Sequence, residues 1–183
     1  MRIVCIGDSL THGYGVTFGS GWVELLSAAY EGRIQFVNVG IDGDTLEGML
    51  YRVHRLITDA DMVILMGGTN NVLMGRDATS CLTLLDRIIR VVQEEEIPLM
   101  VCLAPPIDGE IAEENGVLRD YNELVRHYCE DRHIHTIDFY HLIDTHRKKG
   151  EALYVGDVHV NERGHQYMAN LAQAAIDAYG DLR

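Results

Sequence analysis

The sequence predicts an α/β protein, and the prediction depends on two patterns that alternate along it. Short apolar runs typical of buried strands alternate with longer segments of helical periodicity along the whole chain of 183 residues. Such alternation indicates a parallel sheet with right-handed crossovers and helices on both faces. We therefore expect a three-layer α/β/α sandwich around a flavodoxin-like, five-stranded parallel sheet, in the order 2-1-3-4-5. No repeat or linker interrupts residues 1–183, so the chain predicts a single domain.

The elements follow from the apolar pattern taken in chain order. Strands are predicted at residues 3–6, 34–39, 62–66, 99–103 and 135–139. Helices are predicted near residues 21–31, 46–58, 78–96, 118–132 and 162–179, with a shorter one around 140–149. The longest irregular stretch, 104–116, follows the fourth strand, and we expect it to wall or cover a pocket.

Charge and composition exclude several classes of partner. The formal net charge of −13 argues against nucleic acid and against an anionic membrane surface. No apolar run approaches the length of about 18 residues that a membrane helix needs. The first strand begins near residue 2, which leaves no room for a signal peptide, so we expect a cytoplasmic protein. The four cysteines form no C-x-x-C pair, and Cys5 and Cys102 fall inside predicted strands, which suits buried thiols in a reduced compartment.

Glycine and small polar residues follow each of the first three strands, at residues 7–9, 38–45 and 67–71. The carboxyl ends of neighbouring parallel strands surround one crevice, where ligands bind in open α/β sheets. Ser9 stands directly beyond the first strand. Backbone N–H groups at glycines and the side chain of an Asn are donors that an oxyanion needs.

A hydroxyl nucleophile also needs a general base, and nine histidines are available. His159 is the best placed, because it precedes Asn161, which we expect to cap the last helix. His12, three residues after Ser9, is the alternative. His135 opens a strand, and five others lie in helical or helix-end stretches where we expect surface residues: His54, His127, His133, His141 and His146.

At these residues the chain resembles the SGNH, or GDSL, esterases and lipases. Four blocks match in order: Gly7-Asp8-Ser9-Leu10, Asn38-x-Gly40-x-x-Gly43-x-Thr45, Gly68-Thr69-Asn70 and Val158-His159-x-Asn161. The resemblance implies that Ser9 is the nucleophile and His159 the base. It also implies that the N–H groups of Ser9 and Gly40, with the side chain of Asn70, form the oxyanion hole.

The sequence departs from the family pattern in two blocks. The third block usually ends in Asp, where this chain has Asn71, and we interpret that change as structural. The last block is usually Asp-x-x-His, but Gly156 takes the acid position and Asp157 is separated from His159 only by Val158. Either Asp157 still reaches His159 as the third catalytic residue, or a backbone carbonyl or water orients the imidazole. Asp8 is expected mainly to brace its loop.

Competing motifs are missing from the sequence. There is no G-x-S-x-G elbow, no dinucleotide fingerprint, no Walker loop and no convincing metal-ligand spacing, so no cofactor or metal is expected.

The sequence therefore predicts a metal-free serine hydrolase that cleaves carboxylic esters or thioesters of short-to-medium acyl groups. A carbohydrate O-deacetylase and a non-catalytic module that binds a small ligand in the same crevice are the alternatives. Four residues of the matching blocks are expected to border the substrate: Asp8, Leu10, Thr69 and Val158. Seven apolar residues near the crevice are weaker candidates for an acyl groove: Leu46, Met49, Leu73, Met74, Pro105, Pro106 and Ile107.

Overall fold

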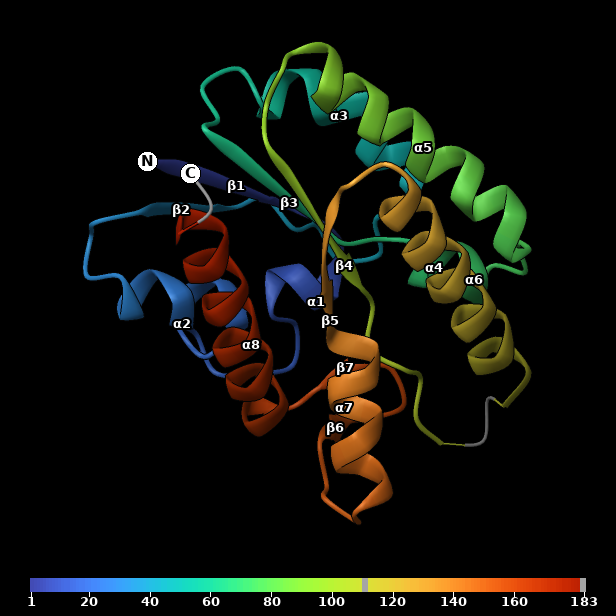
Figure 1. Ribbon diagram of the computed structural model, residues 1–183. Helices are drawn as coiled ribbons and strands as arrows, with labels where there is room; N and C mark the ends of the chain where they lie inside the picture. Colours follow the sequence, from blue (N-terminus) through green and yellow to red (C-terminus); the bar gives the residue numbers. More distant parts are fainter. Residues whose placement is uncertain (110–111, 182–183) are drawn as a thin grey trace.

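A parallel five-stranded sheet forms the centre of the computed structural model, which describes residues 1–109 and 112–181 (Figure 1). Its strands are β1 (Arg2–Ile6), β2 (Gln35–Asn38), β3 (Met62–Leu65), β4 (Leu99–Leu103) and β5 (His135–Asp138). They lie in the order β2-β1-β3-β4-β5, and every neighbouring pair is parallel. The predicted sheet, with its order, is confirmed.

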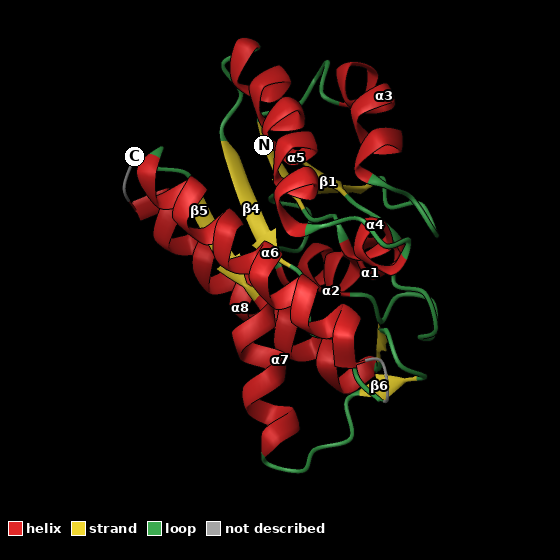
Figure 2. Ribbon diagram, turned by 90° about the vertical axis from the view of Figure 1, so that its right-hand side faces the viewer, coloured by secondary structure: helices red, strands yellow, loops and turns green. Residues whose placement is uncertain are grey.

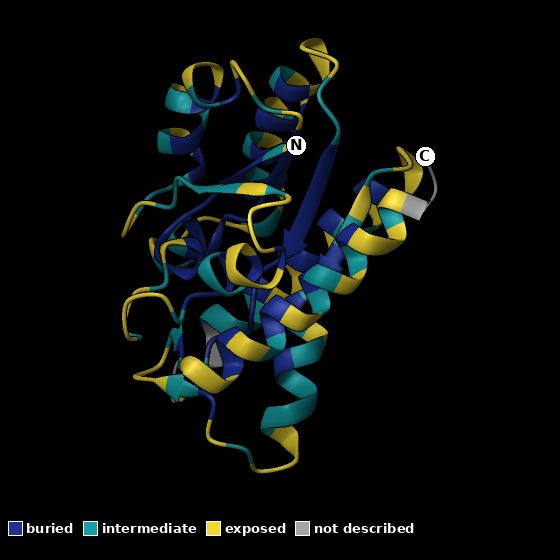
Figure 3. Cartoon of the chain, turned by 90° about the vertical axis from the view of Figure 1, so that its left-hand side faces the viewer, coloured by how far each residue is buried: buried dark blue, intermediate teal, exposed yellow. Residues whose placement is uncertain are grey.

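The apolar runs account for which strands lie in the middle. Residues Ile3–Ile6 of β1 and all of β3 and β4 are buried, whereas the edge strands β2 and β5 are partly exposed. Figure 3 shows the same contrast between the buried centre of the sheet and the exposed outer faces of the helices. Strands covered by helices on both faces need continuous apolar sequence, and β1, β3 and β4 have it. All four cysteines are free and buried, as expected for Cys5 and Cys102.

Two groups of helices cover the sheet (Figures 1 and 2). One group contains α3 (Leu46–Leu56), α5 (Ala78–Glu94) and α6 (Ala112–Asp131), with α3 packed on α5 and α5 on α6. The other contains α2 (Trp22–Ala29) and α8 (Glu162–Asp181), which pack together, and α7 (Phe139–Lys148), which packs on α8. Each predicted helix is present, including the shorter one now seen as α7.

The differences from prediction lie in the segments that connect the predicted strands and helices. Helix α6 begins at Ala112, so the stretch expected to be irregular through residue 116 ends earlier, and its residues 110–111 lie outside the described chain. Three short features were not predicted: α1 (Ser9–His12), α4 (Thr69–Leu73) and a hairpin of β6 (Tyr154–Val155) and β7 (His159–Val160). They are too short to show a periodic pattern, and they carry the site.

Within residues 1–109 and 112–181, no helix has both the length and the apolar character needed to span a membrane.

Candidate active site

Ser9 begins helix α1 at the point where β1 ends. The Asp8 side chain caps this helix by accepting the Leu10 N–H at 2.9 Å, and Gly13 ends it in the left-handed region at φ 87°. As the first residue of the helix, Ser9 has an N–H without an intrahelical acceptor. The strand, the tight turn and the cap together hold Ser9 at the carboxyl edge of the sheet.

His159 reaches Ser9 from the other end of the chain. It lies on β7, opposite Val155 in the hairpin, and its Nε2 is 3.0 Å from Ser9 Oγ across 150 residues of sequence. This is the distance that a nucleophile and its base require. Asn161 then accepts the Gly164 N–H at 3.1 Å, which is the predicted cap of the last helix.

The environment of the imidazole favours its neutral form. Burial lowers the pKa of His159 below its usual value, and the negative charge of Asp42 opposes this shift. The other candidate base, His12, is half-exposed, and its Nδ1 lies 2.7 Å from Asp42 Oδ1. The structure therefore brings His159, and not His12, to Ser9.

Asp157 is not brought to His159. Its backbone carbonyl accepts the Asp108 N–H at 2.7 Å, and its carboxylate lies against Gly109, where an added Cβ would stand 2.7 Å from Oδ1. Among the described residues, Ser9 is the single hydrogen-bond partner of the His159 ring. Of the two possibilities left open by the sequence, this geometry favours an imidazole oriented by something other than Asp157.

The three expected oxyanion donors come from neighbouring strand ends. Gly40 lies so close to the α1 turn that an added Cβ would be 2.4 Å from the His12 nitrogen, so only glycine fits. Its N–H donates to Asn38 Oδ1 at 3.0 Å. Asn70, on α4, uses one amide N–H to bind the Asp44 carbonyl at 2.9 Å, and an amide group has a second N–H to offer.

Arg52 ties these strand ends together. Its guanidinium donates to the carbonyls of Val39 at 2.6 Å and Gly7 at 3.0 Å, and to Asp44 Oδ2 at 2.9 Å. The Arg52 and Asp44 side chains are only 15% and 10% exposed. One side chain of α3 thus fixes the loops after β1 and β2, and sequence reasoning missed it because Arg52 matches none of the family blocks.

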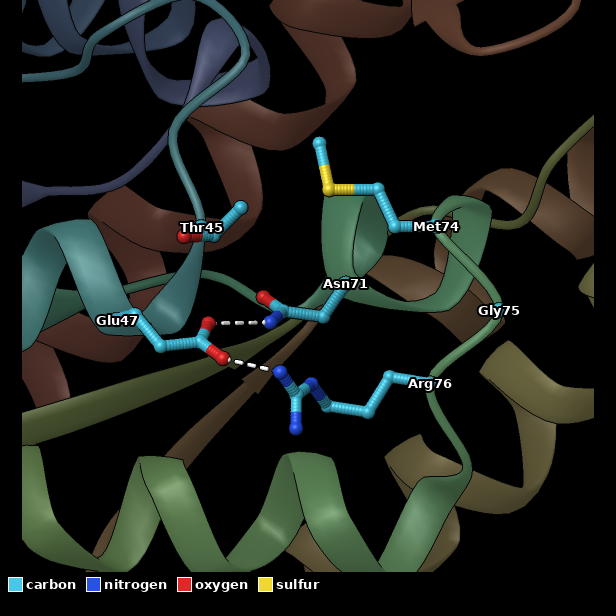
Figure 4. A pocket seen from close by; sticks show the side chains of 6 residues that line it. All are labelled: Thr45, Glu47, Asn71, Met74, Gly75 and Arg76. Carbon is cyan, nitrogen blue, oxygen red and sulfur yellow. Dashed lines mark hydrogen bonds and ion pairs between the residues drawn. The ribbon is translucent and has the colours of Figure 1, made fainter.

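A cavity of about 440 Å³ lies beside Asn71, the residue that follows Asn70 in the chain (Figure 4). Buried Asn71 accepts the Leu46 N–H at 2.8 Å and donates to Glu47 Oε2 at 2.6 Å, and Glu47 also pairs with Arg76. An Asp at position 71 would accept from Leu46 but would have nothing to donate to Glu47. The Asn therefore fits its neighbour, in agreement with the structural interpretation of this change. The cavity is lined by Thr45, Glu47, Asn71, Met74, Gly75 and Arg76.

The residues expected to border the substrate lie mostly beneath the site. Asp8, Leu10 and Thr69 are buried, and Val158 is half-buried. Asp8 Oδ2 has no hydrogen-bond partner within the part of the chain that the structure describes, and burial raises the pKa of its carboxyl to about 7. Among the seven acyl-groove candidates, Met74 is exposed and Leu73 is half-buried, while the other five belong to the buried interior.

An apolar rim on the loops that carry the site was not predicted. We use this term for five exposed residues on the loops that follow β1, β2 and β3 and on the hairpin: Tyr14, Phe18, Ile41, Met74 and Val155. Tyr14 lies against His159, with their ring centroids 4.6 Å apart. The glycines on both sides of Tyr14 were the sequence signal that could have singled it out, because they mark a turn that places the ring.

Comparisons with known proteins agree with this architecture. The model of the GDSL-like lipase/acylhydrolase family matches residues 5–167. A solved structure of a lipolytic protein of the G-D-S-L family from Veillonella parvula is 34% identical, with a TM-score of 0.88, and the alignment covers 95% of this chain and 97% of that one. No curated protein matched the sequence.

Two further solved structures share the fold at lower identity. An acetyl xylan esterase, AlAXEase, is 20% identical, with a TM-score of 0.84 over 96% of this chain and 100% of that one. The psychrotrophic esterase EstA from Pseudoalteromonas sp. is 21% identical, with a TM-score of 0.79 over 98% of each chain. The extent of the family match and the 34% identity over nearly the whole length lead to one conclusion: this chain belongs to the GDSL-like lipase/acylhydrolase family.

Proposed function

We propose that the protein is a serine hydrolase that cleaves carboxylic esters or thioesters of short-to-medium acyl groups. Ser9 Oγ attacks the carbonyl carbon while His159 Nε2 accepts the serine proton. The N–H groups of Ser9 and Gly40 and the amide of Asn70 stabilise the tetrahedral oxyanion. His159 then protonates the departing alcohol or thiol, and water, deprotonated by His159, hydrolyses the acyl-enzyme.

The observation that carries the proposal is the distance of 3.0 Å between Ser9 Oγ and His159 Nε2. The lowered pKa of His159 adds to it, since a base must be unprotonated at the working pH. In this scheme Gly40 exchanges its bond to Asn38 for the oxyanion. Family membership supports an acyl substrate.

The apolar rim supports the acyl preference, because exposed hydrophobic side chains on the loops that follow the site-bearing strands suit an acyl chain. A second candidate, carbohydrate O-deacetylation, is favoured by a different observation. The cavity of Figure 4 offers a hydroxyl, a carboxylate, an amide and a guanidinium, which suits a hydroxyl-bearing substrate. One neighbour of this fold is an acetyl xylan esterase.

A fluorophosphonate probe tests the mechanism. It should label the wild-type protein at Ser9, and labelling should be lost in Ser9→Ala and His159→Ala. Ser27→Ala, which changes an exposed serine on α2, is the matched control and should label normally. An unlabelled wild type would instead favour a non-catalytic binding module.

A substrate series separates the two candidates. Nitrophenyl esters of increasing chain length, acyl thioesters and an acetylated xylo-oligosaccharide would be compared by kcat/KM. The acyl preference predicts a maximum among the short-to-medium esters or thioesters. A maximum for the acetylated sugar, reduced in Arg76→Met but not in Arg90→Met, which changes an exposed residue of α5, would establish deacetylation instead.

A further inference from the structure

Tyr14 is held at the site by its backbone. Gly13 and Gly15, on either side, both adopt the left-handed region, with φ of 87° and 86°. The Tyr14 N–H donates to the Ser9 carbonyl at 3.1 Å, directly after the last turn of α1. These constraints fix where the Tyr14 side chain leaves the loop.

The ring of Tyr14 lies over the imidazole of His159. The centroids are 4.6 Å apart and the planes are inclined by 46°, a tilted aromatic contact. The same loop approaches the hairpin at Gly15, where an added Cβ would lie 3.7 Å from Val155 and 3.9 Å from His159 Cβ. Tyr14 is 52% exposed, so part of its side chain faces solvent while its ring contacts His159.

No carboxylate among the described residues is hydrogen-bonded to His159, whereas the Tyr14 ring packs against its imidazole. Orienting the base is a large part of what the third residue of a triad does. We propose that Tyr14 is a positioning residue, whose ring holds the His159 imidazole toward Ser9 and covers it from solvent. This inference rests on the proposed function, in which His159 is the base.

The groups that face His159 influence the pKa of its imidazole. Ser9 on α1 contacts Nε2, Asp42 on the loop after β2 contributes a negative charge, and His165 on α8 is an electrostatic neighbour. Asp42 is itself paired with His12. His165 accepts the Trp22 N–H, and burial lowers its pKa to about 4, so it adds no positive charge near neutral pH. Uncovering the ring should therefore raise the His159 pKa toward its ordinary value, because desolvation is what lowers it.

The test compares Tyr14→Leu with Tyr14→Phe. In Tyr14→Leu, kcat should fall about tenfold with little change in KM, and the acid limb of kcat/KM should move to higher pH. NMR titration of the imidazole, assigned with His159→Gln, should show the same upward pKa shift. Tyr14→Phe keeps the ring and should keep the wild-type pH profile. Tyr51→Leu, which changes an exposed tyrosine on α3 outside the apolar rim, is the control and should leave the His159 pKa unchanged.

Three outcomes would overturn the inference. They are an unshifted His159 pKa with normal kcat in Tyr14→Leu, a rise in KM alone, or a loss in Tyr14→Phe as large as in Tyr14→Leu. Failure of the proposed function itself gives a different result, because either the wild type would be inactive or Ser9→Ala would keep its activity, whatever happens at position 14.

Discussion

The Arg52 guanidinium on α3 binds the Asp44 carboxylate at 2.8 Å, and both side chains are nearly buried. Arg52 also donates to the carbonyls that end β1 and begin the loop after β2, and the Asp44 carbonyl holds Asn70. The ion pair therefore links the three strand ends that carry the serine and the expected oxyanion donors.

Arg52→Met should destabilise the protein by about 3 kcal/mol, because it leaves the Asp44 carboxylate buried and unpaired. Urea unfolding would measure the change. The double variant Arg52→Met/Asp44→Asn removes the orphaned charge and should regain part of the loss. If the double variant were less stable than the single one, the unpaired charge would not be the cause.

Asn70→Ala should lower kcat about 10²–10³-fold, because one donor to the oxyanion is lost. Asn70 is only half-buried, so a melting temperature close to that of the wild type would show that the fold is kept. The expected signature is a fall in kcat with a much smaller change in KM. A loss of less than about tenfold would remove Asn70 from the oxyanion site.

Asp157→Asn tests whether this carboxylate orients the base. An orienting carboxylate is worth about 10⁴-fold in turnover. Because the Asp157 side chain lies against Gly109 and not His159, we expect kcat to change by less than about tenfold. Steady-state kinetics decide the matter: a drop of several thousandfold would mean that Asp157 reaches His159 during the reaction.

Asn71→Asp should destabilise the protein near neutral pH by about 1–3 kcal/mol. The new carboxylate would stand where Asn71 Nδ2 now donates to Glu47 at 2.6 Å, so two acceptors would face each other. Adding Glu47→Gln supplies an amide donor and should restore much of the stability, as measured by chemical denaturation. A neutral effect of Asn71→Asp alone would show that the network of Figure 4 tolerates either residue.

Asp8→Asn should flatten the dependence of stability on pH. The pKa of Asp8 rises from 3.8 to about 7 on burial, so the folded state holds a proton that the unfolded state releases in this range. Stability contributed by the protonated carboxyl is therefore lost as pH rises through this window. Asparagine can still accept the Leu10 N–H and does not ionise. The free energy of unfolding of Asp8→Asn, relative to that of the wild type, should therefore be higher at about pH 8 than at about pH 5.

Urea unfolding at the two pH values measures this difference. Asp77→Asn, at the exposed cap of α5, is the matched control, because hydrogen bonds from Ser80 lower the pKa of that carboxyl and it stays ionised over this range. If the free energy of unfolding changed with pH in the same way in Asp8→Asn and the wild type, the prediction that buried Asp8 ionises in this range would be wrong.

The sheet could be predicted from the sequence because its determinants are local and repetitive. Runs such as Ile3–Ile6 can be buried only as strands between helix layers, and strict alternation with helices leaves few topologies. The candidate residues Ser9, Gly40, Asn70 and His159 could also be named from the sequence, since they lie in short blocks that resemble the family pattern.

The rest depended on contacts between segments distant in sequence. The approach of His159 to Ser9 spans 150 residues, and the three bonds of Arg52 join α3 to the ends of two strands. The direction in which Asp157 points is set by the loop at Gly109, and the cover over His159 by a tyrosine near the other end of the chain. The sequence by itself determined which elements form and which residue types gather at the sheet edge, because backbone preference and apolar periodicity act locally. Only the tertiary structure decided which side chains meet there, because packing between distant segments sets their orientation.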